Sequence, residues 1–495
     1  MQLLTELLKN YHGTIAIEGN ADTIAVTLVT ADSRQVVKGA VFAAIRGNTT
    51  DGSVYAIEAL EKGTVAILAD HGNKMVLPKS ATVIRVDNVR LALSKMAEAL
   101  YTPQPKYIAA ITGTDGKTST ADFLRQLWYM DHLKSASIGT LGIVDETGNQ
   151  LAPGLNTTPD PAVLHQALQS LAKKGCQHVA MEASSHGLHQ YRLDGVHVKA
   201  AAFTNLTRDH LDYHETIEAY FQAKARLFSE VLPNSGTAVL NADDAKFKRL
   251  NEICKKRNIK VISFGKNGAQ YKIKKVAALN DGLGVQVEIN GKSQHFMLNM
   301  IGEFQVMNAL TALGLYVGCG GNLAEGIRHL PHLHNVKGRL EKVATHPDGA
   351  PIFIDYAHTP SALANALKTT RNHVKGRLVV VFGCGGDRDK GKRSEMGKVA
   401  SELADAIIVT DDNPRSENPE SIRTEIMLGA PKAKNIPGRA EAITHAVKEL
   451  GNNDVLLIAG KGHENTQIIG KQTLPFNDGD VAREAVKLCT KKKVS

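Results

Sequence analysis

The chain has 495 residues, which exceeds the size of a single folded core and predicts about three domains. Hydrophobic residues make up 43% and charged residues 22%, as in soluble globular proteins, and no apolar run reaches the roughly 18 to 20 residues that span a bilayer. The net charge of +9 could mark a nucleic-acid partner, but the basic residues are dispersed and aromatic residues make up only 5%, so we favour a basic surface that attracts small anionic substrates.

The first block, residues 1–102, predicts a small β-rich domain. Its N-terminus reads MQLLTELLKNYHG, which predicts a short amphipathic helix and lacks the basic flank of a secretory signal. Five scattered cysteines without C-x-x-C spacing indicate neither a zinc site nor a disulfide framework and fit a cytoplasmic protein. Apolar runs predict four strands and one helix, at Thr23–Val29, Val41–Ile45, Val65–Leu68 and Thr82–Val86, and at Leu91–Leu100.

After the linker-like segment 102–105, TPQP, apolar strands alternate with helical patterns, which is typical of parallel sheets with crossover helices. The stretch 270–300 is marked by glycines and predicts a small antiparallel insert. The predicted fold class is therefore α/β with three domains, at 1–102, 103–337 and 338–495, the central one a P-loop ATPase domain and the last Rossmann-like. The predicted strands of the second and third domains are His178–Met181, Ala200–Thr204, Thr237–Leu240, Val261–Phe264, Ile352–Asp355, Leu378–Gly383, Ala406–Thr410 and Val455–Ala459.

The segment 106–120, KYIAAITGTDGKTST, predicts a phosphate-binding loop. A buried strand opens into a turn with Gly113 and Gly116, and a helical pattern follows. Glycines let backbone N–H groups approach an anion, the helix N-terminus adds partial positive charge, and Lys117 supplies a mobile one. Thr118 offers a hydroxyl to a Mg²⁺ ion on the phosphates. Ile111 stands where the strict pattern has glycine, so the loop is shorter than usual.

Three further residues follow strands or lie in a helix of the same domain. Glu182 ends the strand HVAME, at the edge where open α/β sheets bind ligands, and His210 lies in the polar turn TRDHLDYH. Lys224 lies within the apolar helical segment YFQAKARLF. Each has a plain alternative: Glu182 as a helix cap, His210 as a turn histidine, and Lys224 as a lysine that extends its amine to the surface.

Together the motifs TGTDGKTS, MEASSH, TNLTRDHLDYH and AKARLF resemble the Mur ligase superfamily, ATP-dependent enzymes that join an amino acid to a carboxylate. The resemblance continues through GRLE (338–341), DYAHTP (355–360), FGCGGDRDKGKR (382–393), DDNPR (411–415) and AGKGHE (459–464), and so covers nearly the whole chain. Two positions depart from the family pattern. Asp115 and Gln305 stand where the family usually has asparagine, and we expect activity to be retained.

The resemblance implies that ATP converts a substrate carboxylate into an acyl phosphate, which an amine then attacks. Lys117 then clamps the phosphates. Thr118 and Glu182 hold one Mg²⁺, and Glu182 and His210 hold a second. Lys224 is carbamylated by CO₂, which turns a repelling cation into an oxygen ligand. The ATP-binding residues implied by the resemblance are Gly113, Thr114, Asp115, Gly116, Lys117, Thr118, Ser119, Asn308, Arg339 and Asp355.

Within the family, TADSRQV and FAAIRGNTTDG resemble the UDP-binding N-terminal domain of the ligases that add the third residue of the peptidoglycan stem peptide. The implied acceptor is UDP-MurNAc-L-Ala-D-Glu. An ordinary turn is the alternative for the segment 156–159, NTTP. The residues that match the family's contacts to this substrate are Ser33, Asn48, Thr49, Thr50, Asn156, Thr157, Thr158, Ser184, Gln190 and Arg192.

The segment Asp412-Asn413-Pro414-Arg415 indicates the amino acid, because a guanidinium binds the distal carboxylate of meso-2,6-diaminopimelate, which lysine lacks. Arg388, Gly460 and Glu464 match the family's other diaminopimelate contacts. A structural Arg415, a lysine-adding homologue, a folylpolyglutamate synthetase and a nucleic-acid motor stay open as alternatives, although residues 1–102 argue against the synthetase. We expect a cytoplasmic monomer with small-molecule substrates and no membrane insertion.

Overall fold

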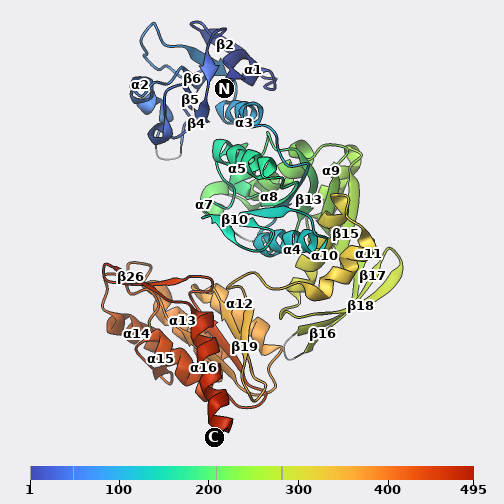
Figure 1. The fold of residues 1–495 in the computed structure, drawn as a ribbon, viewed down its shortest axis with the longest axis vertical. Helices are drawn as coiled ribbons and strands as arrows, with labels where there is room; N and C mark the ends of the chain where they lie inside the picture. Colours follow the sequence, from blue (N-terminus) through green and yellow to red (C-terminus); the bar gives the residue numbers. More distant parts are fainter. Residues whose placement is uncertain (1, 48–49, 155, 208, 280–281, 495) are drawn as a thin grey trace. The chain divides into compact units, whose positions relative to one another are not determined.

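The computed structural model describes residues 2–47, 50–154, 156–207, 209–279 and 282–494. It forms two compact units, Met1–Tyr271 with Leu310–Ile327 and Lys272–Ala309 with Arg328–Ser495. The predicted domain boundaries at 102 and 337 stay a prediction. The α/β fold class is confirmed, because both units are built from mostly parallel sheets covered by helices (Figure 1).

The N-terminal sheet of the first unit has the strand order β2-β7-β6-β5-β4, in which only β2 is antiparallel. The predicted N-terminal helix is confirmed as α1, whose Leu4, Leu7 and Leu8 are buried in the core. The predicted strand 23–29 is wrong as one element, because β3 pairs with β1 while β4 pairs with β5. The bounds are β1 Gln2–Leu3, α1 Leu4–Leu8, β2 Ile15–Glu18, β3 Ala25–Val26, β4 Leu28–Thr30, η1 Ser33–Gln35, β5 Ala40–Ala43, η2 Gly52–Tyr55, α2 Ala56–Glu61, β6 Ala66–Asp70, β7 Val83–Val86 and α3 Val89–Leu100.

The strands of a second sheet that lie in this unit have the order β11-β10-β9-β12-β8-β13-β14-β15 and are parallel except for β10 and β11. Its central strands are buried on both faces, which explains their continuous apolar sequences. β8 lies between β12 and β13, so the loops after these strands meet at one edge. The strands are β8 Tyr107–Thr112, β9 Ser135–Gly139, β10 Gly142–Asp145, β11 Gln150–Ala152, β12 His178–Glu182, β13 Val198–Phe203, β14 Thr237–Asn241 and β15 Lys260–Gly265.

The helices around this sheet begin with α4, which follows the predicted phosphate loop directly. Its buried residues include Phe123, Leu127 and Trp128, which recur at helical spacing. The helical segments are α4 Lys117–Met130, α5 Pro161–Lys173, α6 Ser185–His189, α7 Leu211–His214, α8 Ile217–Arg226, η3 Leu227–Val231, α9 Phe247–Lys256, α10 Phe304–Gly318 and α11 Leu323–His329.

The second unit holds a sheet of order β19-β20-β24-β21-β22-β23, in which only β19 is antiparallel. Alternate residues of its strands face opposite layers: α12, α13 and α14 pack on one face, and α15 and α16 on the other. The predicted antiparallel insert is confirmed as β16–β18. The bounds are β16 Tyr271–Leu279, β17 Gly282–Ile289, β18 Lys292–Leu298, η4 Leu330–His332, β19 Glu341–Thr345, β20 Pro351–Asp355, α12 Pro360–Arg371, β21 Leu378–Phe382, α13 Gly391–Leu403, β22 Ala406–Val409, α14 Pro419–Met427, β23 Lys434–Asn435, α15 Arg439–Lys448, β24 Val455–Ala459, β25 Thr466–Ile469, β26 Gln472–Pro475 and α16 Asp478–Val494.

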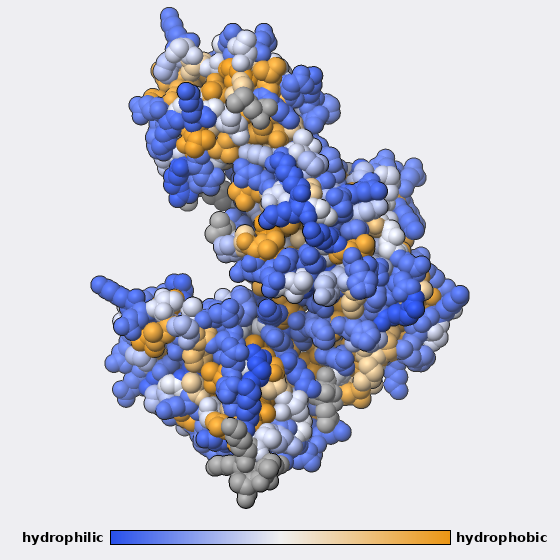
Figure 2. Space-filling model, viewed as in Figure 1, coloured by the Kyte–Doolittle hydropathy of each residue, from blue (hydrophilic) through white to orange (hydrophobic). Residues whose placement is uncertain are grey.

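Hydrophilic residues cover most of the face shown in Figure 2, and hydrophobic residues lie among them in separate groups. The most exposed large hydrophobic side chains, Val54, Val76 and Leu428, belong to different segments. Within the described residues, none of the helices combines the length and the apolar character that a membrane span requires.

Candidate functional site

The predicted phosphate loop connects β8 to α4 and requires glycine at two positions. Gly113 has a φ of 146°, and a β-carbon there would collide with Thr204 Oγ1. Gly116 has a φ of 83° and is the residue before the 14-residue helix α4. The loop therefore takes a conformation that favours glycine and lies at a helix N-terminus, where anions bind.

Asp115 is fixed by its backbone rather than by its side chain. Its N–H donates to Asn205 Oδ1 at 2.9 Å, and its carbonyl accepts from Thr204 Oγ1 at 2.6 Å. The side chain is exposed. An aspartate at this position therefore leaves intact the main-chain contacts that shape the loop.

Glu182 ends β12 beside the loop and is 2% exposed. Its Oε1 accepts hydrogen bonds from Thr118 Oγ1 at 2.9 Å and from the Thr140 N–H at 2.8 Å. Burial raises its pKa, and nearby Lys117 opposes that shift. The side chain that caps α6 is Ser184, so the interpretation of Glu182 as a helix cap is wrong.

Two lysines converge on one carbonyl group of the loop. Lys224 is 1% exposed and donates from Nζ to the Gly113 carbonyl oxygen at 2.7 Å. Lys117 donates to the same oxygen at 3.0 Å and to the Thr114 carbonyl at 2.7 Å. Burial, with the charge of Lys117, lowers the pKa of Lys224 well below its ordinary value. Lys224 therefore does not extend to the surface, as the alternative interpretation required.

His210 lies in an exposed turn with a φ of 51°, its Nε2 at 3.4 Å from Asp209 Oδ2. Its ring centroid is 6.1 Å from that of Tyr220, and Lys224 Nζ lies 4.4 Å from the Tyr220 ring centroid. Tyr220 thus neighbours two of the four predicted metal ligands, His210 and Lys224. In the described ranges, no group of three or more His, Cys, Asp or Glu residues is arranged to hold a metal ion.

A cavity of about 790 Å³ lies in the first unit and has the size of a small-molecule site. Three of the residues predicted to bind the UDP-linked substrate line it: Ser33, Asn156 and Arg192. Of the remaining ones near the N-terminus, Asn48 and Thr49 lie outside the described residues and Thr50 is exposed.

Three other predicted substrate residues, Thr158, Ser184 and Gln190, are joined with Arg192 in one hydrogen-bonded chain. Thr158 Oγ1 donates to the Glu182 carbonyl at 2.9 Å and accepts from the Ser184 N–H at 2.9 Å. Arg192 donates to the Thr158 carbonyl at 2.7 Å and to Gln190 Oε1 at 2.8 Å. This chain connects the cavity residue Arg192 to the strand end that carries Glu182.

In the second unit, a series of hydrogen bonds links the predicted nucleotide residues Asn308 and Asp355. Asn308 Nδ2 donates to Gln305 Oε1 at 2.9 Å, and Gln305 Nε2 donates to Asn335 Oδ1 at 2.8 Å. Asn335 Nδ2 donates to the Leu340 carbonyl at 2.5 Å, and the Leu340 N–H donates to Asp355 Oδ2 at 2.8 Å. Gln305, which departs from the family pattern, is therefore the buried residue that connects Asn308 to Asn335 in this series.

Arg339 precedes Leu340 in the same segment. Its guanidinium lies 5.1 Å from the centroid of the Tyr356 ring, within the range of a cation–π contact. The predicted nucleotide residues of the second unit thus lie on three elements: Asn308 on α10, Arg339 in the segment before β19, and Asp355 at the end of β20.

Two arginines predicted to contact diaminopimelate, Arg388 and Arg415, lie beside the same glycine, Gly385. A β-carbon at Gly385 would lie 2.8 Å from Arg415 Nη1 and 3.8 Å from Arg388 Cγ. Arg415 has a φ of 51°, and its Nη1 donates to the Gly386 carbonyl at 2.8 Å. The missing side chain at Gly385 therefore leaves room for the Arg415 guanidinium.

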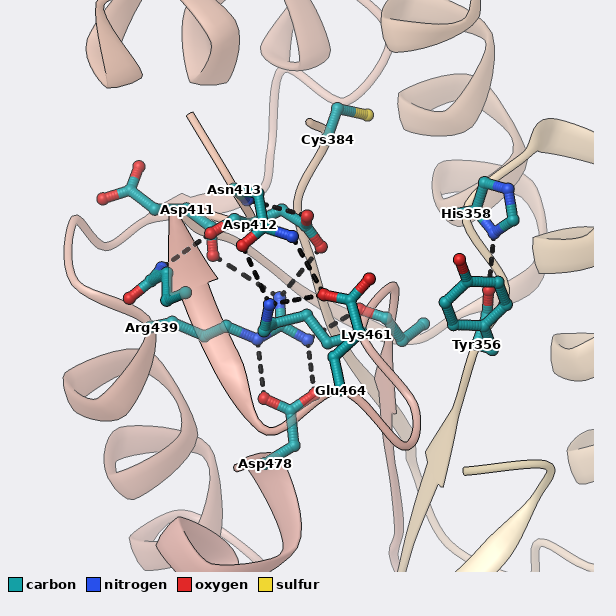
Figure 3. A network of polar contacts seen from close by, with 12 residues as sticks. Tyr356, His358, Cys384, Asp411, Asp412, Asn413, Arg439, Lys461, Glu464 and Asp478 are labelled. Carbon is teal, nitrogen blue, oxygen red and sulfur yellow. Dashed lines mark hydrogen bonds and ion pairs between the residues drawn. The ribbon is translucent and has the colours of Figure 1, made fainter. Parts of the chain in front are cut away.

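Three other predicted diaminopimelate residues, Asp412, Asn413 and Glu464, belong to one polar network, in which Asp412 and Asn413 are buried (Figure 3). Asn413 Nδ2 donates to Glu464 Oε2 at 2.9 Å. Gly460 has a φ of 116°, and a β-carbon there would lie 2.7 Å from Asp412 Oδ2. Burial raises the pKa of Asp412. Pro414 is buried, and a β-carbon at Gly386 would collide with its carbonyl.

Several residues of the site were not among the sequence predictions. Thr140 donates from its N–H to Glu182, and its Oγ1 lies 3.2 Å from Thr157 Oγ1. Thr204 and Asn205 hold the phosphate loop. All three lie at the carboxyl ends of β9 and β13, so polar residues directly after a strand were the signal that could have identified them.

The sequence matches three regions of one family: the Mur ligase family catalytic domain over residues 25–101, the Mur ligase middle domain over 111–316 and the Mur ligase glutamate ligase domain over 338–462. The UDP-N-acetylmuramoyl-L-alanyl-D-glutamate--2,6-diaminopimelate ligase of Bradyrhizobium diazoefficiens is 48% identical over 477 residues, 95% of this chain and 97% of that protein. The ligase of the same name from Rhizobium meliloti is 46% identical over 470 residues, 95% of this chain and 96% of that protein.

Solved structures of Mur ligases and related enzymes are also similar to this chain. One with the same ligase name has a TM-score of 0.74 and 32% identity, covering 98% of this chain and 99% of its own. A folylpolyglutamate synthase from Mycobacterium tuberculosis has a TM-score of 0.55 and 17% identity and covers 75% of this chain and 91% of its own, which shows a shared fold only. Because the family matches and the 48% identity to a curated ligase extend over nearly the whole sequence, this chain belongs to the Mur ligase family of ATP-dependent, amide-bond-forming enzymes.

Proposed function

We propose that this chain joins meso-2,6-diaminopimelate to the glutamyl carboxylate of UDP-MurNAc-L-Ala-D-Glu, with ATP, in peptidoglycan precursor synthesis. The observation that carries the proposal is the 48% identity, over 95% of the chain, to a ligase named for these two substrates. The pair of arginines at Gly385 supports it, because a guanidinium can bind the distal carboxylate that distinguishes diaminopimelate from lysine.

The reaction brings two anions, ATP and the UDP-linked substrate, together with an amino acid that carries two carboxylates, so positioning and positive charge govern its rate. The substrate carboxylate takes the γ-phosphoryl group of ATP to give an acyl phosphate and ADP. The diaminopimelate amine then attacks the carbonyl carbon, phosphate leaves, and the amine loses a proton as the amide forms. The phosphate loop and Lys117 are proposed to bind the phosphoryl group during the first step.

The residues beside the loop fit Mg²⁺, which prefers hard oxygen donors. Thr118 supplies a hydroxyl and Glu182 a buried carboxylate, 2.9 Å apart, and His210 is the proposed further ligand. When bound, Mg²⁺ would neutralise phosphate charge. Lys224 fits a carbamate because its lowered pKa favours the neutral amine, the form that reacts with CO₂.

The remaining predicted residues keep their proposed roles. Those that line the 790 Å³ cavity, or are linked to it through Arg192, bind the UDP-linked substrate. The series from Asn308 to Asp355 binds the nucleoside of ATP. We further propose a monomer that acts in the cytoplasm on small molecules, without a nucleic-acid partner.

Phosphate release tests the proposed function. Release from ATP should require both UDP-MurNAc-L-Ala-D-Glu and diaminopimelate, and the product should have the mass of the tripeptide. Folate with glutamate, or DNA alone, should give none. Release stimulated by DNA, or by folate with glutamate, in place of the muramoyl dipeptide would contradict the proposal.

A further inference from the structure

Lys461 is a cation enclosed in the second unit. Its side chain is 0% exposed and lies in the loop after β24. Its ammonium group donates to Asn413 Oδ1 at 3.0 Å and to Glu464 Oε2 at 2.8 Å (Figure 3). Both partners are proposed diaminopimelate contacts, so this buried charge acts on the amino-acid site through the two residues that it hydrogen-bonds.

The lysine fixes which way the Asn413 carboxamide faces. Oδ1 accepts from Lys461 and also from the Ile468 N–H at 3.0 Å, while Nδ2 donates to Glu464 Oε2 at 2.9 Å. A carboxamide turned by half a rotation would point its NH₂ group at two other donors, with no acceptor among them. The orientation seen is therefore the one that Lys461 and the Ile468 N–H select together.

The same charge sets the state and rotation of the Glu464 carboxylate. Burial raises its pKa, but the hydrogen bonds from Lys461 and Asn413 outweigh burial, and the pKa lies below its ordinary value. Both bonds end on Oε2. The side chain is 31% exposed, and within the described part of the chain no hydrogen bond reaches Oε1. Glu464 is thus held as an anion with one oxygen available.

The neighbouring buried arginine, Arg439, does not orient Glu464. Arg439 forms two hydrogen bonds of 2.7 Å with Asp478, one to each carboxylate oxygen. Its Nη1 lies 4.0 Å from Asp412 Oδ2. The charge of Arg439 is therefore answered mainly by Asp478, which leaves Lys461 as the cation that hydrogen-bonds Glu464.

We propose that Lys461 is a positioning residue for the amino-acid substrate. It orients Asn413 and Glu464 so that Glu464 Oε1 accepts from the distal ammonium group of the diamino acid, and it does not touch the substrate itself. This inference rests on the proposed function, and extends it by naming the buried charge through which the site recognises a second amino group.

A double-mutant cycle on the full-length enzyme tests the role, with Lys461→Met, Glu464→Gln and the double variant compared by KM for all three substrates. Lys461→Met should raise KM for diaminopimelate roughly ten- to hundredfold, the range of a lost hydrogen bond to a charged group. KM for ATP and for the UDP-linked substrate should stay within about twofold. Because Lys461 acts through Glu464, adding Lys461→Met to Glu464→Gln should change KM for diaminopimelate by less than about threefold.

The double variant also removes both charges together, so it avoids a lone buried charge if Lys461→Met alone does not fold. Lys471→Met, at an exposed turn between β25 and β26, is the matched control. Two results would overturn the role of Lys461. One is a double variant whose KM for diaminopimelate rises by the product of the two single-variant increases, and the other is an equal rise of KM for all substrates in Lys461→Met. Absence of diaminopimelate-dependent product from the wild-type chain would instead overturn the proposed function.

Discussion

A hydrogen bond of 2.7 Å joins Nζ of Lys224 to the carbonyl oxygen of Gly113. The two residues are 111 positions apart in sequence, and the bond connects α8 to the first glycine of the phosphate loop. Lys117 donates to the same oxygen. A change in charge at Lys224 therefore acts directly on the loop that is proposed to bind the phosphates.

Lys224→Ala should lower the rate of ligation by roughly a hundredfold or more, because it removes a buried group from the site where phosphate charge develops. Added formate or acetate should restore part of the rate, since a short carboxylate can replace the carbamate oxygen. Phosphate release is the measurement, with Lys248→Ala at an exposed position as the control. Full activity of Lys224→Ala without added carboxylate would exclude the proposed carbamate.

The sequence predicted those parts of the site that depend on local order. Glu182 is the last residue of a buried strand, and the carboxyl end of such a strand is where ligands bind, so its place was predictable. Lys224 was ambiguous, because a lysine within an apolar helical pattern can lie at the surface or be buried. Only the packing of α8 against the loop decides, and Lys224 is 1% exposed.

The contacts between elements could not be predicted in this way. Asn205 and Thr140 act through main-chain and side-chain bonds to residues far away in sequence, and no local pattern encodes these partners. The series from Asn308 to Asp355 likewise depends on how α10, the segment 335–340 and β20 pack. The buried pair Arg439 and Asp478 gave no sequence signal, because isolated charges are usually at the surface.

Gly385→Ala should disturb diaminopimelate binding without a change at either arginine. The new β-carbon would lie 2.8 Å from Arg415 Nη1, so the guanidinium must shift and lose its bond to the Gly386 carbonyl. KM for diaminopimelate should rise roughly tenfold, while KM for ATP stays the same. Steady-state kinetics check this, with Gly72→Ala as the control because a β-carbon there meets open space. Unchanged KM for diaminopimelate would show that Arg415 does not need this space.

Gln305→Asn should weaken ATP binding, although asparagine is the family's usual residue. The asparagine side chain is one methylene shorter and cannot reach both Asn308, which now donates to Gln305 at 2.9 Å, and Asn335, which now accepts from it at 2.8 Å. KM for ATP should rise roughly fivefold to tenfold. Adding Asn335→Gln returns the missing methylene from the other side and should recover most of the loss. A single variant with unchanged KM for ATP would contradict the positioning of Asn308 by Gln305.

Glu417→Gln should destabilise the protein in a pH-dependent way. Hydrogen bonds from the fully buried Arg393 hold the pKa of Glu417 at about 2, below its ordinary 4.5. A carboxyl pKa lowered by folding contributes stability above the ordinary value and loses it as pH falls toward the folded one. The difference in unfolding free energy between wild type and variant should therefore be full at about pH 7 and shrink as pH falls toward about 3.

Urea unfolding at a series of pH values measures this difference. Glu402→Gln is the control, because its side chain is 59% exposed and its ion pair with Lys398 is long, at 4.0 Å. A difference for Glu417→Gln that grew as pH fell would contradict the assigned pKa direction.

Selection of diaminopimelate through Arg415 can be measured in one competition experiment. Wild-type enzyme receives ATP, UDP-MurNAc-L-Ala-D-Glu and equal concentrations of meso-diaminopimelate and L-lysine, and the two products are quantified by mass spectrometry. We expect an excess of the diaminopimelate product on the order of 10³-fold, because lysine leaves a guanidinium unpaired, and a much smaller excess with Arg415→Ala. An excess of the lysine product from the wild-type enzyme would show that the chain does not select diaminopimelate, and an unchanged ratio with Arg415→Ala would make that arginine structural.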